Sequence, residues 1–191
     1  CTCTCTSTRY QSSSTCGQKI AALRQCAAAW SCVSSTNSLH AMNAALALDQ
    51  GFRDHHTGAG HPESPARYVA VTKALQEAGL VHQMQPLDIR DATDDEIQLC
   101  HPKGYLSVVK AHIEAGASTL STGDTQISAQ SLVVARRAVG SVLNAVDLAF
   151  AGKVKRSFCA VRPPGHHARP AQGMGFCLFN NIAIGARHAQ R

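Results

Sequence analysis

The sequence lacks several features that mark common classes of protein. No apolar run approaches the ~20 residues of a membrane-spanning helix, so no membrane association is predicted. There is no glycine-rich phosphate loop and no repeated structural unit. No stripe of Lys and Arg is interleaved with aromatic residues, which argues against direct nucleic-acid binding. A globular chain of one domain remains, which its 191 residues allow.

The start of the chain has no acidic residues, and the first one is Asp49. The net charge is +6, and half of it comes from Arg9, Lys19 and Arg24. Residues 42–191 carry the other half, with 15 basic and 12 acidic side chains. The basic character is therefore partly a property of the N-terminal segment, and it is thin evidence for an acidic partner.

Residues 1–41 differ in composition from the rest of the chain. Cys1–Thr6 is a Cys-Thr repeat, and six of the nine cysteines precede residue 42. Four interpretations compete: a zinc or disulfide module, an organelle transit peptide, a disordered tail, and translated sequence upstream of a start at Met42. The first is weak, because no later Cys or His cluster has metal-ligand spacing. The fourth is favoured and the transit peptide is second, and both place the functional domain at residues 42–191.

The other three cysteines, Cys100, Cys159 and Cys177, are dispersed through this domain. Isolated cysteines serve as small apolar residues in a reduced compartment. We therefore expect a cytoplasmic protein, or an organelle-targeted one if residues 1–41 are a transit peptide. The oligomeric state is left open.

Strand and helix patterns alternate along the domain. Apolar residues recur at helical spacing over 128–150, and Thr93-Asp94-Asp95-Glu96 has the pattern of a capped helix start. The expected strands are 44–48, 81–87 and 158–161, and the expected helices are 65–78, one from 93, 103–115, 128–150 and 181–190. This alternation predicts an α/β fold with a mainly parallel sheet. Ligands of such sheets usually bind at the carboxyl ends of the strands.

The segment with the clearest chemistry follows the last expected strand. His166 and His167 stand next to Pro163-Pro164-Gly165, which restricts the backbone before them. Imidazole is well suited to proton transfer near neutral pH, so the pair indicates acid–base or metal chemistry. Adjacent histidines also occur in solvated loops without a role, and His55-His56 is interpreted as such a pair.

Four segments of the chain resemble one known family. Arg162-Pro163-Pro164-Gly165-His166-His167-Ala168, followed by Gly175-Phe176-Cys177-Leu178-Phe179-Asn180-Asn181, resembles the tandem-histidine motif of the zinc-dependent histone deacetylase and acetylpolyamine amidohydrolase family, closest to its class II and bacterial members. Gly60–Arg67, His101–Val108 and Leu120–Ser128 resemble further family segments in the same order. The resemblance covers about residues 44–191. It implies a three-layer α/β/α fold of the arginase/deacetylase type.

The resemblance also implies a reaction and its residues. The family hydrolyses acetyl-lysine-type amides, so the substrates would be acetylated proteins such as histones, acetylated polyamines or other acylated amines. His167 would act as general base and then acid, and His166 would stabilise charge and orient water. The Gly175 carbonyl would accept from the substrate amide, and Phe176 would line the tunnel. Arg67 is assigned, more weakly, to an inner channel.

The family's zinc ligands come from an Asp-x-His motif on the next strand and from a later Asp, and its transition-state tyrosine is later still. Asp54-His55-His56 lies in an N-terminal loop and does not fit. We therefore expect the chain to be the N-terminal part of a deacetylase domain, truncated at its C-terminus, without zinc ligands and inactive alone, with Zn²⁺ bound in the full-length protein. Asp124 is interpreted as a helix cap or loop anchor.

Two alternatives to this enzyme remain. A deacetylase-like fold could serve as a non-catalytic module that binds acyl ligands. Alternatively, the histidines could ligate a metal directly in an unrelated hydrolase.

Overall fold

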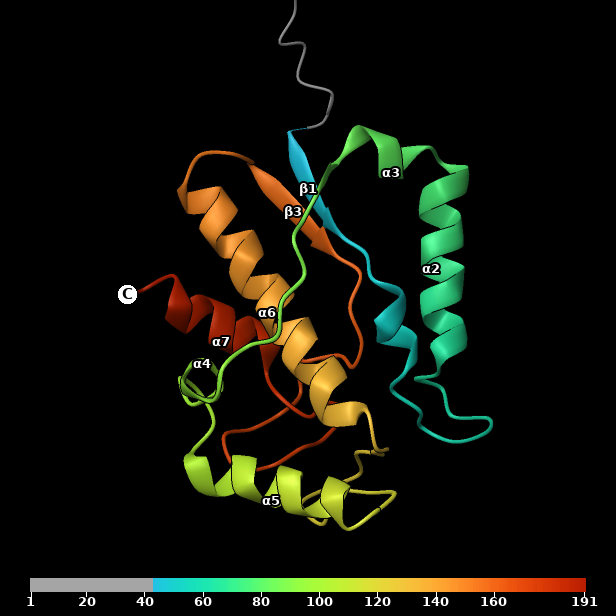
Figure 1. Ribbon diagram of the computed structural model, residues 1–191, viewed down its shortest axis with the longest axis vertical. Coiled ribbons are helices and arrows are strands. Elements are labelled where there is room, and N and C mark those ends of the chain that lie inside the picture. Colours follow the sequence, from blue (N-terminus) through green and yellow to red (C-terminus); the bar gives the residue numbers. More distant parts are fainter. Residues whose placement is uncertain (1–42) are drawn as a thin grey trace, which may run out of the picture. The chain divides into compact units, whose positions relative to one another are not determined.

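The computed structural model describes residues 43–191, and the expectations for residues 1–41 lie outside this range. A parallel three-stranded sheet in the order β2-β1-β3 organises the fold (Figure 1). The strands are β1 (Ala44–Ala47), β2 (Gln85–Pro86) and β3 (Arg156–Cys159), and the helices are η1 (Gln50–Arg53), α2 (Pro65–Glu77), α3 (Leu80–Gln83), α4 (Asp94–Ile97), α5 (Lys103–Glu114), α6 (Ser131–Phe150) and α7 (Asn181–His188).

Strand β1 is buried on both faces, which makes the fold three layers deep. Successive side chains of a strand point to opposite faces. Ala44 and Leu46 pack with Met84 and with apolar residues of α2 and α3, whereas Ala45 and Ala47 pack with α6. Figure 1 shows α2 and α6 on opposite sides of β1. The predicted α/β/α class with a parallel sheet is therefore confirmed.

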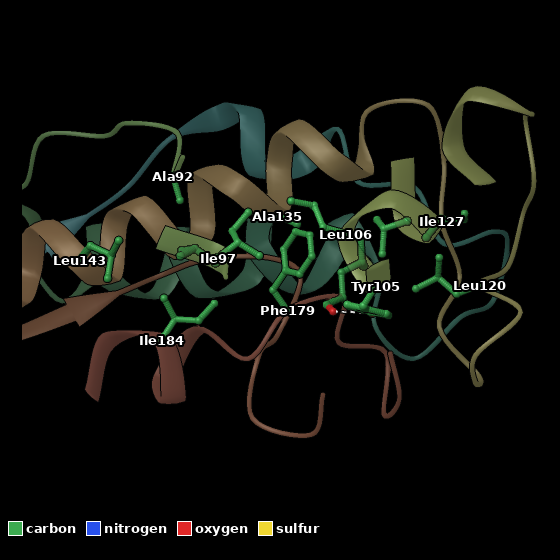
Figure 2. Close-up of a cluster of buried hydrophobic side chains, with 13 residues drawn as sticks. Ala92, Ile97, Tyr105, Leu106, Leu120, Ile127, Ala135, Leu143, Phe179 and Ile184 are labelled. Carbon is green, nitrogen blue, oxygen red and sulfur yellow. Dashed lines mark hydrogen bonds between the residues drawn. The ribbon is translucent and has the colours of Figure 1, made fainter. Parts of the chain in front are cut away.

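A separate apolar cluster joins α4, α5 and α6 to α7 and the segment before it (Figure 2). Tyr105 of α5 and Phe179 form an edge-to-face aromatic pair with ring centroids 6.3 Å apart. Ile184 of α7 and Leu143 of α6 are fully buried in the same cluster. The cluster holds the chain after the tandem histidines against α5 and α6.

The connection into α4 crosses α6 at Gly140. A Cβ atom at this position would overlap the carbonyl of Arg90, so glycine is required for the crossing. The Ala92 N–H donates to the Arg136 carbonyl at 3.0 Å, and the Arg136 guanidinium pairs with Asp94. Helix α4 then begins with the predicted capping box of Thr93.

Two of the expected strands were placed wrongly. Residues 81–87 form the end of α3 and the two-residue β2, because a helical turn brings Leu80, Val81 and Met84 onto the same side of β1. Strand β3 begins at Arg156 rather than 158, and its pairing ends at Cys159. It is also more exposed than expected: Phe158 is 48% exposed, and β3 pairs only with β1 in the described part of the chain.

Between residues 43 and 191, no helix combines the length and apolar character needed to cross a membrane.

Candidate active site

The tandem histidines lie in the loop between β3 and α7, beyond the carboxyl end of β3. Both imidazoles are exposed, and their ring centroids are 4.1 Å apart at an interplanar angle of 48°. Gly165 sits against Asn181 at the start of α7, too close for any side chain. The contact between Gly165 and Asn181 thus fixes the backbone that carries the two exposed histidines.

Gly175 lies directly against His167. A Cβ atom on Gly175 would stand 2.6 Å from Cγ of His167, and the backbone has a φ of +55°. Glycine is therefore needed both for contact with the imidazole and for the left-handed backbone. The next residue, Phe176, also has a positive φ, +67°. The structure brings together His166, His167, Gly175 and Phe176, although their roles stay predictions.

A second loop fixes the peptide of Gly175. Oδ1 of Asp124 accepts the Gly175 N–H at 2.7 Å. Asp124 is therefore a loop anchor, which was one of the two roles expected for it. Close by, Gly123 touches the Gly173 backbone so tightly that no side chain fits between them. Asp124 and Gly175 are far apart in sequence, and their hydrogen bond joins the two loops. The carboxylate of Asp124 thereby positions the glycine that packs on His167.

A buried histidine closes the loop from the inside. Nδ1 of His101 contacts the Pro170 carbonyl at 2.9 Å, and Nε2 accepts the Asn180 N–H at 2.9 Å. The neutral imidazole protonated at Nδ1 satisfies both contacts. Burial lowers the pKa of His101, which favours this neutral form. His101 therefore ties both ends of the segment carrying Gly175 and Phe176.

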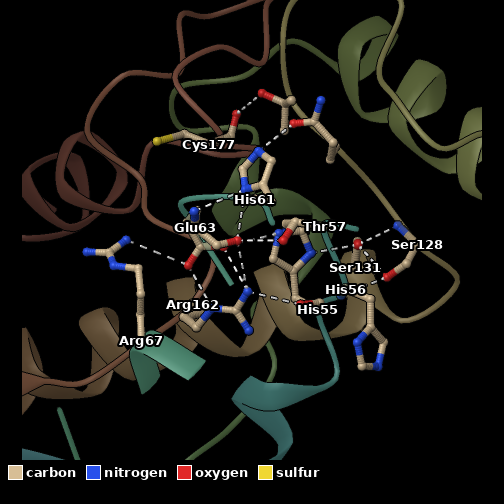
Figure 3. Close-up of polar contacts among 12 residues, drawn as sticks. His55, His56, Thr57, His61, Glu63, Arg67, Ser128, Ser131, Arg162 and Cys177 are labelled. Carbon is tan, nitrogen blue, oxygen red and sulfur yellow. Dashed lines mark hydrogen bonds and ion pairs between the residues drawn. The ribbon is translucent and has the colours of Figure 1, made fainter. Parts of the chain in front are cut away.

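A buried ion pair lies under the start of the tandem-histidine loop (Figure 3). Nε and Nη2 of Arg162 bind the two carboxylate oxygens of Glu63 at 2.6 and 2.8 Å. The same guanidinium donates to the carbonyls of Phe52 and His55 at 3.0 Å each. Arg162 and Glu63 are 3% and 1% exposed, so the two charges neutralise each other away from water.

The interpretation of His55-His56 as a solvated pair is wrong for His55. Its ring is fully buried, with Nδ1 2.7 Å from Oγ of Ser131 and Nε2 3.8 Å from Oε2 of Glu63. The order Ser–His–Glu resembles that of a catalytic triad, but all three residues are buried and the carboxylate is bound to Arg162. This group supports the loop and offers no nucleophile to a substrate. His56 is exposed.

His55 makes the fold sensitive to acid. Burial, and then the charge of Arg162, lower the pKa of His55 to about 3. The unfolded chain binds this proton near pH 6.5, so protonation favours the unfolded state. We expect stability to fall as the pH drops from about 6.5 towards 3.

Urea unfolding at several pH values measures this effect. Between pH 6.5 and 4.5, the slope should be shallower in His55→Asn than in the parent, by about 1 kcal/mol per pH unit. Equal slopes would contradict the assignment. Glu96, whose pKa is lowered from 4.5 to about 2, affects stability mainly below pH 4.5 and equally in both proteins, so it does not alter the difference between the slopes.

Arg67 extends from the first turn of α2 towards the same ion pair. Its side chain is 63% exposed, and Nη1 lies 3.9 Å from Oε1 of Glu63. Together with Tyr68, Arg162 and Pro164 it lines a cavity of about 180 Å³. The position is compatible with the predicted inner channel, which stays a prediction.

No three His, Cys, Asp or Glu side chains gather as a metal site within residues 43–191. The role of His166 and His167 in proton transfer stays a prediction.

Sequence reasoning found the four residues around the tandem histidines and missed their buried supports. Glu63 and Arg162 each belong to a segment used for the family resemblance, and their opposite charges were the available signal. Glu63 and Arg162 each stand beside prolines and could have been considered as a pair. The role of His101 depended on the path of the chain through Pro170 and Asn180, which no local pattern indicates.

The α/β/α fold and the tandem-histidine loop together define a class of protein, and a comparison of the chain with family models agrees. The model of the "Histone deacetylase domain" family matches residues 61–191, and the chain belongs to this family.

Its relatives include bacterial and animal proteins. It is 40% identical over 148 residues to "Uncharacterized protein slr0245" of Synechocystis sp., a match covering 76% of this chain and 48% of that protein. It is 36% identical over 134 residues to "Polyamine deacetylase HDAC10" of Rattus norvegicus, covering 68% and 23%. The solved HDA15 HD domain superposes with a TM-score of 0.73 at 34% identity, covering 78% of this chain and 44% of that one. The chain thus spans about half or less of each relative's length.

Proposed function

We propose that this chain carries the acid–base and substrate-binding part of a hydrolase that removes acetyl or related acyl groups from amines. The observation that supports this most directly is the contact between Gly175 and the His167 imidazole, with Phe176 next in sequence. In this proposal a proton-transfer group, a carbonyl acceptor and an aromatic wall share one loop. Family membership supports amide hydrolysis as the reaction class.

The proposed roles are those that the family resemblance implies, and the geometry supports them. His167 takes a proton from the attacking water and returns it to the amine nitrogen as the amide bond breaks. His166, with its ring centroid 4.1 Å away, orients the water and stabilises the developing charge. The Gly175 carbonyl accepts the substrate N–H. This carbonyl oxygen already accepts a hydrogen bond from the Cys177 thiol at 3.4 Å, and its second lone pair is available to the substrate.

The metal belongs to the proposal as well. Zinc, when bound in such an enzyme, polarises the acyl carbonyl and activates the water. The residues described here do not by themselves fit the ion, and we propose that its ligands come from parts of the family's domain that this chain does not span. A groove of about 490 Å³, between α6, β3 and the Pro164–His166 turn, lies beside the open edge of β3 and could seat such a segment.

Turnover by the complete protein tests this function. We expect release of acetate from an acetyl-lysine peptide or from an acetylated diamine, loss of the activity on chelation, and recovery on adding Zn²⁺. The two substrates distinguish a protein deacetylase from a polyamine deacetylase. Binding of both without turnover would contradict the enzyme and support the non-catalytic module instead.

A further inference from the structure

We propose that Glu63 is a positioning residue that sets the distance between the tandem histidines and the wall residue Phe176. This inference rests on the proposed function, because it concerns how that site keeps its width. The contacts run from Arg162 through Glu63 and His61 to Phe176, and Figure 3 shows the first three side chains side by side.

The carboxylate of Glu63 controls the histidine side of the site. It binds Arg162 through both oxygens, and Arg162 directly precedes the Pro163-Pro164 pair. Proline fixes its own φ and restricts the residue before it, so the orientation of the Arg162 backbone is passed on along the loop. A displaced guanidinium would therefore move His166 and His167.

The backbone of Glu63 controls the aromatic side. Its N–H and its carbonyl oxygen both lie 3.0 Å from Nδ1 of His61. With the proton of this imidazole on Nε2, Nδ1 accepts the Glu63 N–H. Nε2 then donates to Oε1 of Gln126 at 2.9 Å. With both ring nitrogens engaged, His61 meets the Phe176 ring edge-on at 4.5 Å and 77°.

Phe176 needs such support more than an ordinary wall residue does. Its φ of +67° is uncommon for any residue except glycine and costs energy that the surroundings must offset. His61 contacts the ring, while the Asp124 carboxylate holds the preceding peptide. The position of Phe176 therefore depends on its neighbours. One of these is His61, which contacts the backbone of Glu63.

A purely structural role for Glu63 makes different predictions. The other charges near its carboxylate are the mostly exposed Arg67 at 3.9 Å and His55 at 3.8 Å, which is neutral near pH 7 because of its low pKa. If the pair with Arg162 only stabilised the fold, removing it would lower stability without altering the site. If Glu63 positions the site, the histidine environment changes at temperatures where the protein is fully folded.

The experiment compares Glu63→Gln with Glu96→Gln in the complete protein. Glu96 makes a similar two-oxygen pair with Arg90, at 2.7 and 2.9 Å, and its residues lie outside the site. Imidazole ¹H–¹⁵N spectra should shift for His166 and His167 in Glu63→Gln alone, whereas His61 keeps its contact with the Glu63 backbone. That variant should also lose about 10²-fold in kcat, the usual cost of a 1 Å misplacement. Unchanged site spectra in folded Glu63→Gln would overturn the proposal.

Gln126→Ala tests the aromatic arm if Glu63→Gln does not fold. Gln126 is only half-buried, so this variant is mild. Releasing the His61 Nε2–H should shift the signals of His61 and Phe176 and raise KM by about tenfold with kcat retained, since ground-state and transition-state binding weaken together. No shift in either residue would also overturn the proposal. Because the spectra require no turnover, shifted signals without hydrolysis would refute the proposed function and leave the positioning role standing.

Discussion

Replacing His167 with alanine in the complete protein is expected to lower kcat by about 10²- to 10⁴-fold, the range that general acid–base groups contribute. His167 is exposed and lies against Gly175. Its contribution arises in the transition state, so KM should change little. Steady-state kinetics with an acetyl-lysine peptide measure both quantities.

His82→Ala is the matched control for this experiment. His82 is an exposed histidine on α3, away from the loop, and its loss should leave kcat unchanged. His166→Ala should reduce kcat less than His167→Ala does, because in the proposed roles His166 stabilises charge and His167 carries the proton. Full turnover in His167→Ala, or a larger loss in His166→Ala, would contradict the roles assigned to the two residues.

Arg162→Met is expected to destabilise the fold by about 3–5 kcal/mol, which is typical when one member of a buried ion pair is removed. The variant leaves the Glu63 carboxylate 1% exposed without its bidentate partner, and the carbonyls of Phe52 and His55 lose a donor. Urea unfolding at neutral pH measures the loss.

Two comparisons isolate the buried charge. The double variant Arg162→Met with Glu63→Met should recover part of the stability, since replacing both charges removes the unpaired carboxylate. Arg90→Met breaks the more exposed pair with Glu96 and should cost only about 1 kcal/mol or less. An Arg162→Met loss no greater than that of Arg90→Met would show that the buried pair is not a major source of stability.

The elements predicted best were those that local physics decides. The capping box at Thr93 and the apolar spacing of α6 are local, and both were found. Helix α2 begins at Pro65, as the expected helix 65–78 does. The strand expected at 81–87 was wrong, because a short apolar run fits a strand or a helical turn equally well. Packing against β1, which is remote in sequence, decided between them.

The site divides in the same way. The Pro-Pro-Gly and tandem-histidine residues share one segment, and their chemistry was readable there. Contacts between distant segments were not: Asp124 reaches Gly175, and His101 reaches Pro170 and Asn180 only through the path of the whole chain. Burial of His55 was missed because a His-His pair in a Gly-rich loop has no local pattern that distinguishes core from surface.

The clamp made by His101 also bears on how the family can diversify. It fastens the chain at Pro170 and at Asn180, while Arg169 and Ala171 beside the first anchor are exposed. Side chains at these two positions can change in size or charge without disturbing either hydrogen bond of the clamp. Surface chemistry next to the site can therefore drift in evolution, or be redesigned, while His167 and Gly175 keep their geometry.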